Sequence, residues 1–147
     1  MSLDAIKAQL NTEFAALAGI NRAPTDKPNV AMSAPDCPAI ILDYDDPFLT
    51  SEALVNDMER ESWHFIGRFL YKPTGLSTTD EIDAELEVFP RLIVTQLRST
   101  LRGSGTWTLL GDLIQFNRGP VNYKSDWYHG FTFSFDIYED LATTYGV

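Results

Sequence analysis

Few side chains in this sequence have the type and spacing that catalysis requires. The chain has two histidines, His64 and His129, and a single cysteine, Cys37. Each histidine lies among aromatic residues in a segment typical of a strand, without a nucleophile or an orienting carboxylate next to it. No basic residue adjoins Cys37 to activate its thiol. We therefore expect structural roles for these residues, and we predict no catalytic residue and no enzyme activity.

The motifs of metal and cofactor sites are incomplete in the same way. Asp43, Asp45 and Asp46 lie close together, but the central glycine and terminal glutamate of a calcium loop are missing. Two histidines and one cysteine lack the spacing of a zinc site. The Gly-Ser-Gly at 103–105 lacks the lysine of a phosphate-binding loop and follows a predicted helix instead of opening one. We expect no metal and no cofactor.

The charge of the chain is strongly acidic and unevenly placed. There are 21 Asp and Glu against 11 Lys and Arg, a net charge of −10, and residues 36–61 carry eight of the acids and one base. This balance argues against binding to duplex nucleic acid or to an anionic membrane. The acidic stretch is either a solvated face or a surface that repels a polyanion or meets a basic partner. The candidate residues on such a surface are Asp43, Asp45, Asp46, Glu52, Asp57, Glu59 and Glu61.

Helical periodicity predicts two helices in the framework that positions the residues named above. Apolar side chains recur every three or four residues over 3–17, which predicts an N-terminal helix. The same pattern over 80–102 predicts one long helix, in which Pro90 should cause a kink. Residues 20–38 contain four prolines and no period, and we interpret them as an extended connector.

Period-two alternation of apolar residues predicts the strands. We expect strands at 39–42, 63–72, 106–110, 113–116 and 127–138. The acidic residues 43–47 are interpreted as a turn, and 50–60 as a short helix or an irregular excursion. Gly111 and Asp112 should form a hairpin turn. Gly130 marks a bulge or a close backbone approach, and 141–147 is predicted as a loose tail.

This order of elements predicts a single α+β domain over residues 1–147. Its sheet should be mostly antiparallel, with about four to six strands, an N-terminal helix and one long kinked helix packed on it. The 44% hydrophobic content and 18 aromatic residues suffice for a core of that size. A single cysteine cannot form an internal disulfide, and no apolar run approaches the roughly 18 residues that span a bilayer.

Four segments in this order resemble a known family. They are the aromatic strand Trp63–Tyr71, the helix Asp80–Arg102, the Gly-Thr-Trp-Thr-Leu-Leu segment that follows, and the closing Trp-Tyr-His-Gly-Phe-Thr-Phe-Ser-Phe at 127–135. Together they resemble the tail terminator (tail completion) proteins of long-tailed bacteriophages and related minor tail and neck proteins. The proline-rich connector and the acidic stretch have no counterpart in the resemblance.

The resemblance implies a structural protein of the virion, assembled in the host cytoplasm. Such proteins form a homo-oligomeric ring, typically of six copies, at the head-proximal end of the tail tube. The ring ends tube growth and contacts the tail tube protein and the neck, and DNA passes through it without being bound. It implies no catalytic residues. On this reading the acids at 43–61 line the lumen, where they would not hold phosphate, or face a basic partner ring.

Two alternatives stay open. The chain fits another neck, baseplate or minor tail component, or a small ligand-binding or enzymatic α+β domain with an aromatic pocket. The alternating aromatic face of 127–137 distinguishes them. In a pocket protein that face would line a cavity with converging polar groups, and in a ring protein it would pack against the helices as core and leave no cavity.

Overall fold

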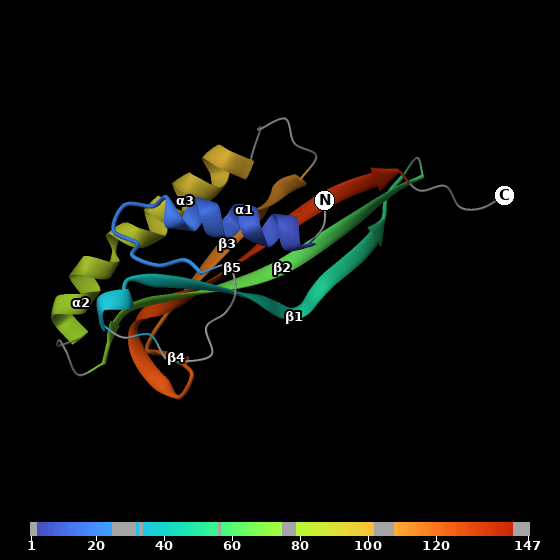
Figure 1. The fold of residues 1–147 in the computed structure, drawn as a ribbon. Coiled ribbons are helices and arrows are strands. Elements are labelled where there is room, and N and C mark those ends of the chain that lie inside the picture. The colour runs from blue at the N-terminus through green and yellow to red at the C-terminus, as the bar shows by residue number, and fades with distance from the viewer. Residues whose placement is uncertain are drawn as a thin grey trace.

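A single antiparallel sheet, covered on one face by helices, forms the framework of the protein. The computed structural model describes residues 3–24, 32, 34–55, 57–74, 79–101 and 108–142. The five-stranded sheet has the order β1-β2-β5-β3, and the short β4 pairs with β5. Helices α1, α2 and α3 lie on the same side of it (Figure 1). The predicted α+β fold is thereby confirmed.

The strands are longer than the sequence pattern predicts. Their bounds are β1 Ala39–Ala53, β2 Met58–Pro73, β3 Thr108–Arg118, β4 Val121–Tyr123 and β5 Asp126–Ala142. The central pair, β2 and β5, runs in register from Met58 opposite Ala142 to Ile66 opposite Ser134 and beyond. This pair follows the aromatic alternation that predicted it, extended at both ends by polar residues whose backbone completes the ladder.

The predicted turn at 43–47 and the predicted short helix or irregular excursion at 50–60 are both wrong, because strand pairing continues through these segments. Tyr44 lies opposite Phe65 and Leu49 opposite Trp63, so three extra residues of β1 bulge out of the ladder where a turn was expected at 43–47. Residues 50–60 form neither a short helix nor an irregular excursion. They form the tip of the β1–β2 hairpin, where the Leu54 amide donates to the Met58 carbonyl at 2.8 Å. The composition of these segments of β1 favours turns, but pairing with β2 holds them in strand conformation.

The predicted hairpin at 106–116 is also wrong. Residues 108–118 form one continuous strand, β3, and 106–107 lie outside the described residues. Leu110 lies opposite Ile137 and Ile114 opposite Phe135, so Gly111 and its neighbours form a bulge in place of a turn. A glycine in an edge strand fits such a bulge.

The helices agree with the periodicity, with one break. α1 covers Leu3–Ala15, α2 covers Thr79–Leu86 and α3 covers Val88–Leu101. The bend falls at Glu87, three residues before Pro90, because a proline obstructs the turn that precedes it and is tolerated in the first turn of α3. The apolar stripe continues across the bend and stays buried. Of the connector, only 20–24, 32 and 34–38 are described, with a short 3₁₀ turn at Ala34–Asp36.

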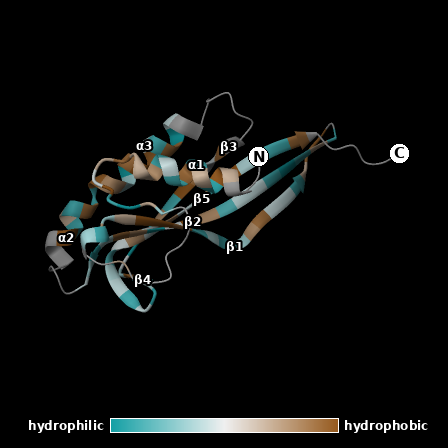
Figure 2. Ribbon diagram, in the orientation of Figure 1, coloured by the Kyte–Doolittle hydropathy of each residue, from teal (hydrophilic) through white to brown (hydrophobic). Residues whose placement is uncertain are grey.

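The main core lies between the sheet and the helices and is rich in phenylalanine. Figure 2 shows hydrophobic residues along the helices and along the strands beneath them, and the buried ones form one cluster between the two layers. Phe14 of α1 meets Phe133 of β5 edge-on at 5.8 Å, and Phe69 stacks on Phe131 at 4.7 Å. A smaller cluster on the opposite face includes Tyr128, whose hydroxyl donates to the Met32 carbonyl at 2.7 Å. The closing aromatic strand is therefore core over most of its length.

Candidate functional site

The acidic residues singled out from the sequence lie on the β1–β2 hairpin, which extends beyond the helical layer (Figure 1). The register puts Glu59 and Glu61 on the helix side of the sheet, in line with Trp63. Asp43 and Glu52 point to the opposite face, which we call the open face. The acids thus share one hairpin but divide between its two faces.

Several of the acids have partners in the structure. The Asp43 carboxylate accepts a hydrogen bond from the Arg68 guanidinium at 2.8 Å, and Glu59 accepts one from the Ser51 hydroxyl at 3.2 Å. Asp45 and Asp46 are exposed in the bulge of β1, and Asp57 is exposed in the hairpin turn, where its φ is 57°. The bulge therefore presents its charge most openly.

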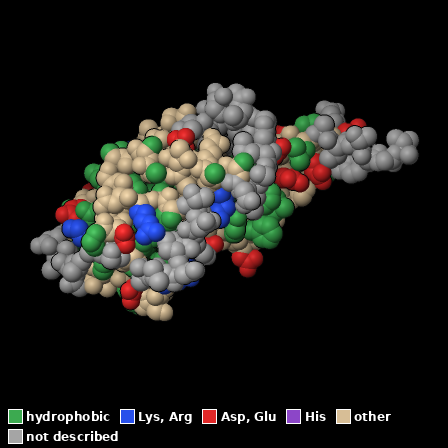
Figure 3. Space-filling model, in the orientation of Figure 1, with side chains coloured by type: hydrophobic (Ala, Val, Ile, Leu, Met, Phe, Trp, Pro, Cys, Tyr) green, Lys and Arg blue, Asp and Glu red, His purple; other side chains and the backbone are tan. Residues whose placement is uncertain are grey.

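An aromatic surface adjoins the bulge. We call Tyr44, Phe48 and Trp63 the aromatic shelf. The Phe48 ring lies 6.2 Å from that of Tyr44 and 6.3 Å from that of Trp63, and Phe48 is 53% exposed. The Lys7 ammonium lies 5.1 Å above the Tyr44 ring, a cation–π distance. Figure 3 shows hydrophobic side chains gathered at the bend of β1 with acidic side chains on both sides.

The open face holds a group of three side chains that sequence reasoning missed. His64 Nδ1 lies 2.5 Å from an Asp136 carboxylate oxygen, and His64 Nε2 lies 2.9 Å from the Thr50 hydroxyl. A carboxylate, an imidazole and a hydroxyl in this order are the groups of a hydrolase triad. The three residues belong to β5, β2 and β1 and are separated by up to 86 residues in the sequence, so no local motif reveals the group.

The triad-like group lies on a part of the sheet that is open to water. Thr50 and Asp136 are well exposed to water, and the three residues line neither cavity found in the described parts of the chain. A hydrolase excludes water and aims preorganised donors at the developing oxyanion. Here the group lies on a solvated sheet face, where it ties three strands together.

A second polar cluster joins the ends of β2 and β5 on the open face. Arg60 donates two hydrogen bonds to the Asp140 carboxylate, at 2.7 and 3.0 Å, and its guanidinium lies 4.2 Å above the Tyr138 ring. The hydrogen bond to Asp140 raises the pKa of Arg60, and the same bond lowers the pKa of the Asp140 carboxyl. The pair holds the projecting strands together without a hydrophobic core beneath them.

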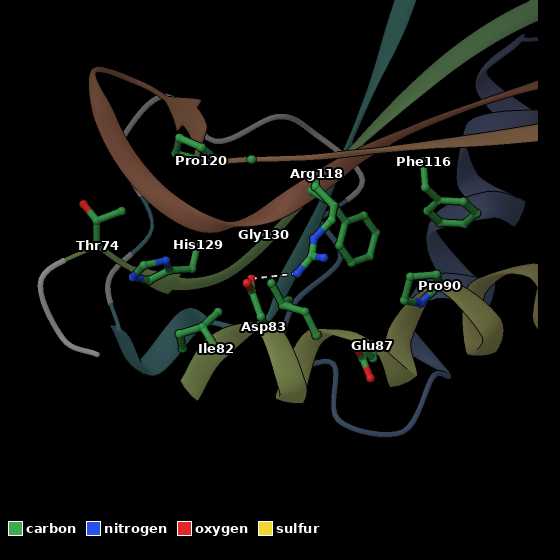
Figure 4. A pocket seen from close by; sticks show the side chains of 13 residues that line it. Thr74, Ile82, Asp83, Glu87, Pro90, Phe116, Arg118, Pro120, His129 and Gly130 are labelled. Carbon is green, nitrogen blue, oxygen red and sulfur yellow. Dashed lines mark ion pairs between the residues drawn. The ribbon is translucent and has the colours of Figure 1, made fainter. Parts of the chain in front are cut away.

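A cavity of about 530 Å³ lies at the other end of the molecule, between α2, the start of α3, and the ends of β3 and β5 (Figure 4). Its volume is in the range of small-molecule sites. The apolar lining consists of Ile82, Leu86, Pro90, Phe116, Pro120 and Phe131. The Arg118 guanidinium pairs with the Asp83 carboxylate at 2.8 Å beside it. His129 also lines the cavity, and its buried Nε2 makes no hydrogen bond.

The aromatic strand 127–137 therefore shows both arrangements that the sequence left open, since part of it packs as core and part of it lines a cavity. Phe133, Phe135 and Ile137 pack as core, while His129 and Phe131 line the cavity. In the described part of the chain, no group of three or more His, Cys, Asp or Glu side chains is arranged to hold a metal ion. None of the described helices is both long and apolar enough to cross a membrane.

Comparison with known proteins gives no family assignment. No protein-family model matches the chain, and no curated protein matches it.

Proposed function

We propose that the protein is a structural component of a bacteriophage tail. Copies form a ring at the head-proximal end of the tail tube, end its growth and join the tail to the neck. The α+β fold agrees with what the resemblance implies, since one antiparallel sheet carries an N-terminal helix and one bent helix on the same face. The proposal places the protein in the virion and assigns it no catalytic role.

The observation that carries the proposal is that the two outer strands of the sheet carry unlike exposed surfaces. β1 and β3 are the outer strands, and β1 carries the exposed Phe48 while β3 carries Leu113, which is 65% exposed. Exposed large apolar side chains on both edges are typical of surfaces that meet other chains. Two unlike surfaces on one molecule allow head-to-tail contacts, and these close into rings when the rotation between copies permits.

The acidic residues have a physical role in this proposal. A ring through which DNA passes should not retain phosphates, and a net charge of −10 opposes such binding. Glu52 on the open face and Glu61 on the helix side cannot both face the same lumen, because the register separates them. One set of acids is then available for a lumen and the other for a protein contact.

Mass photometry and negative-stain electron microscopy of the purified protein test the proposal, alone and with a tail tube protein. We expect closed rings, and in the presence of tube protein we expect tubes capped at one end. A protein that stays monomeric under both conditions would contradict the proposal. If the protein forms rings but the tubes grow as long as they do without it, the protein is better explained as another neck, baseplate or minor tail component.

The cavity favours a second candidate function, a small-ligand domain. Its volume, its apolar lining and the unpartnered Nε2 of His129 are what a buried ligand would use. A thermal-shift screen against metabolites tests this candidate. A ligand that raises the Tm of the wild type but not of the cavity-filling variant Leu86→Trp would support it. The absence of any such ligand would leave the ring as the better account.

A further inference from the structure

We infer that the aromatic shelf of one copy receives the exposed face of α3 of the next copy. This inference rests on the proposed ring and names the surfaces that meet within it. It is drawn from the chemistry of two surfaces on opposite flanks of the same chain.

The first surface is the outer face of α3. Val88, Arg91, Leu92, Thr95 and Arg98 recur at helical spacing and are all exposed. Val88 is 57% exposed and Leu92 is 37% exposed. The sequence of α3 contains no acidic residue. The face therefore combines apolar and cationic side chains, and Pro90 fixes its first turn.

The second surface is the aromatic shelf with its acidic border. The exposed Phe48 ring offers an apolar contact, and Asp45 and Asp46 lie beside it in the bulge. Glu61 lies two residues before Trp63 on the same side of β2. Arginine side chains stack on aromatic faces and pair with carboxylates, so this surface has the groups that Arg91 and Leu92 would contact. The Lys7 ammonium above the Tyr44 ring is an example of such a cation–π contact within the same copy.

The positions of the two surfaces exclude a contact within one copy. α3 packs against β3, at one edge of the sheet, while the shelf belongs to β1 and β2, at the other edge. α1 lies between them in the helical layer (Figure 1). Because the surfaces are complementary but separate, the contact joins one copy to the next in a head-to-tail arrangement.

The bulge determines how the contact is made. Asp45, Asp46 and Pro47 interrupt the ladder of β1. Charges, proline and bulges on an edge strand oppose pairing with another strand. The next copy is therefore held by side chains at the shelf and not by an added β-strand.

Charge reversal tests the contact. One variant carries Asp45→Lys and Asp46→Lys, and the other carries Arg91→Glu and Arg98→Glu. All four residues are exposed, and a Tm measured for each variant checks that it is folded. Alone, each variant brings like charges together, and we expect its assembly to weaken at least about tenfold. An equimolar mixture restores opposite charges at every contact and should assemble as the wild type does.

A matched variant controls for net charge. Asp126→Lys with Asn122→Lys and Ala16→Lys adds the same charge as the first variant at exposed positions off both surfaces, and it should assemble normally. If the reversed variants assemble like the wild type, or if their mixture does not recover, the shelf–α3 contact is overturned while the ring stands. A wild-type protein that never assembles overturns both the contact and the ring.

Discussion

At Gly130 the backbone of β5 lies close to that of β2, and its replacement gives the sharpest test of the fold. A methyl group at Gly130 would lie 1.8 Å from the carbonyl oxygen of Phe69 and 3.0 Å from its carbonyl carbon. The obstacle is backbone, so no side-chain rotation relieves it. Gly130→Ala therefore requires β5 to move away from β2.

The size of the effect follows from the distances. A carbon–oxygen contact needs about 3.3 Å, so the strands must separate locally by roughly 1.5 Å. A ladder hydrogen bond of about 2.9 Å is broken by that displacement. Losing two or three such bonds at about 1 kcal/mol each, together with strand strain, outweighs the gain of up to about 1 kcal/mol from replacing a strand glycine. We expect a loss of about 2–3 kcal/mol and a Tm lower by about 5–10 °C.

Thermal melts followed by circular dichroism, with urea unfolding at one temperature, measure this loss. Gly111→Ala is the graded control, because its methyl group would lie 3.2 Å from Asp136, a contact that a shift of a few tenths of an ångström relieves. It should cost far less than Gly130→Ala. If Gly130→Ala melts within about 1 °C of the wild type, or no lower than Gly111→Ala, the close approach of β2 and β5 is refuted.

Four further outcomes test individual side chains. Asn11 is 2% exposed and neither amide atom has a partner, so Asn11→Leu should raise the free energy of unfolding in urea by about 1–3 kcal/mol; a decrease would contradict the orphaned amide. Burial raises the pKa of the Cys37 thiol to about 11, so native protein at about pH 8 should label with a disulfide reagent only as it unfolds, and rapid native labelling would be inconsistent with that burial. Hydrogen bonds from Arg60 lower the folded-state pKa of the Asp140 carboxyl. The pair therefore contributes stability above the unfolded-state pKa of about 3.9, and this stability is lost as the pH falls through the folded-state pKa. Asp140→Asn should lower the Tm at pH ~7 but not at pH ~2. Wild type and His64→Ala should hydrolyse p-nitrophenyl acetate at the same rate, and a slower variant would show that the triad-like group is catalytic.

Local patterns predicted the elements whose own residues determine them. The apolar stripe of α1 and the alternation of β5 both depend on a period within one segment, and both segments form as expected. The residues Asp45, Asp46 and Pro47 are typical of a turn, yet they lie inside a strand. The partner strand β2, which begins beyond the hairpin tip, decides their conformation, and no local window contains that information.

The candidate sites were harder to predict than the fold, for the same reason. Thr50, His64 and Asp136 meet because three strands align, and the cavity at His129 forms where α2 approaches the end of β5. The sequence did predict an acidic surface on the hairpin segment. It could not show that Phe48 and Trp63 would stack beside those acids, because the bulge that exposes Phe48 depends on the register with β2.

The length of β2 and β5 has a mechanical consequence. Strands of 16 and 17 residues, at about 3.4 Å per residue, run some 55 Å from the tip of the β1–β2 hairpin to the end that holds the cavity. A force applied along this axis loads all the hydrogen bonds between the two strands in shear at once, whereas a force across it would open them one after another. The protein is therefore stiff in the direction that joins its two ends, and it would act as a strut that carries tension or compression between whatever binds at each end.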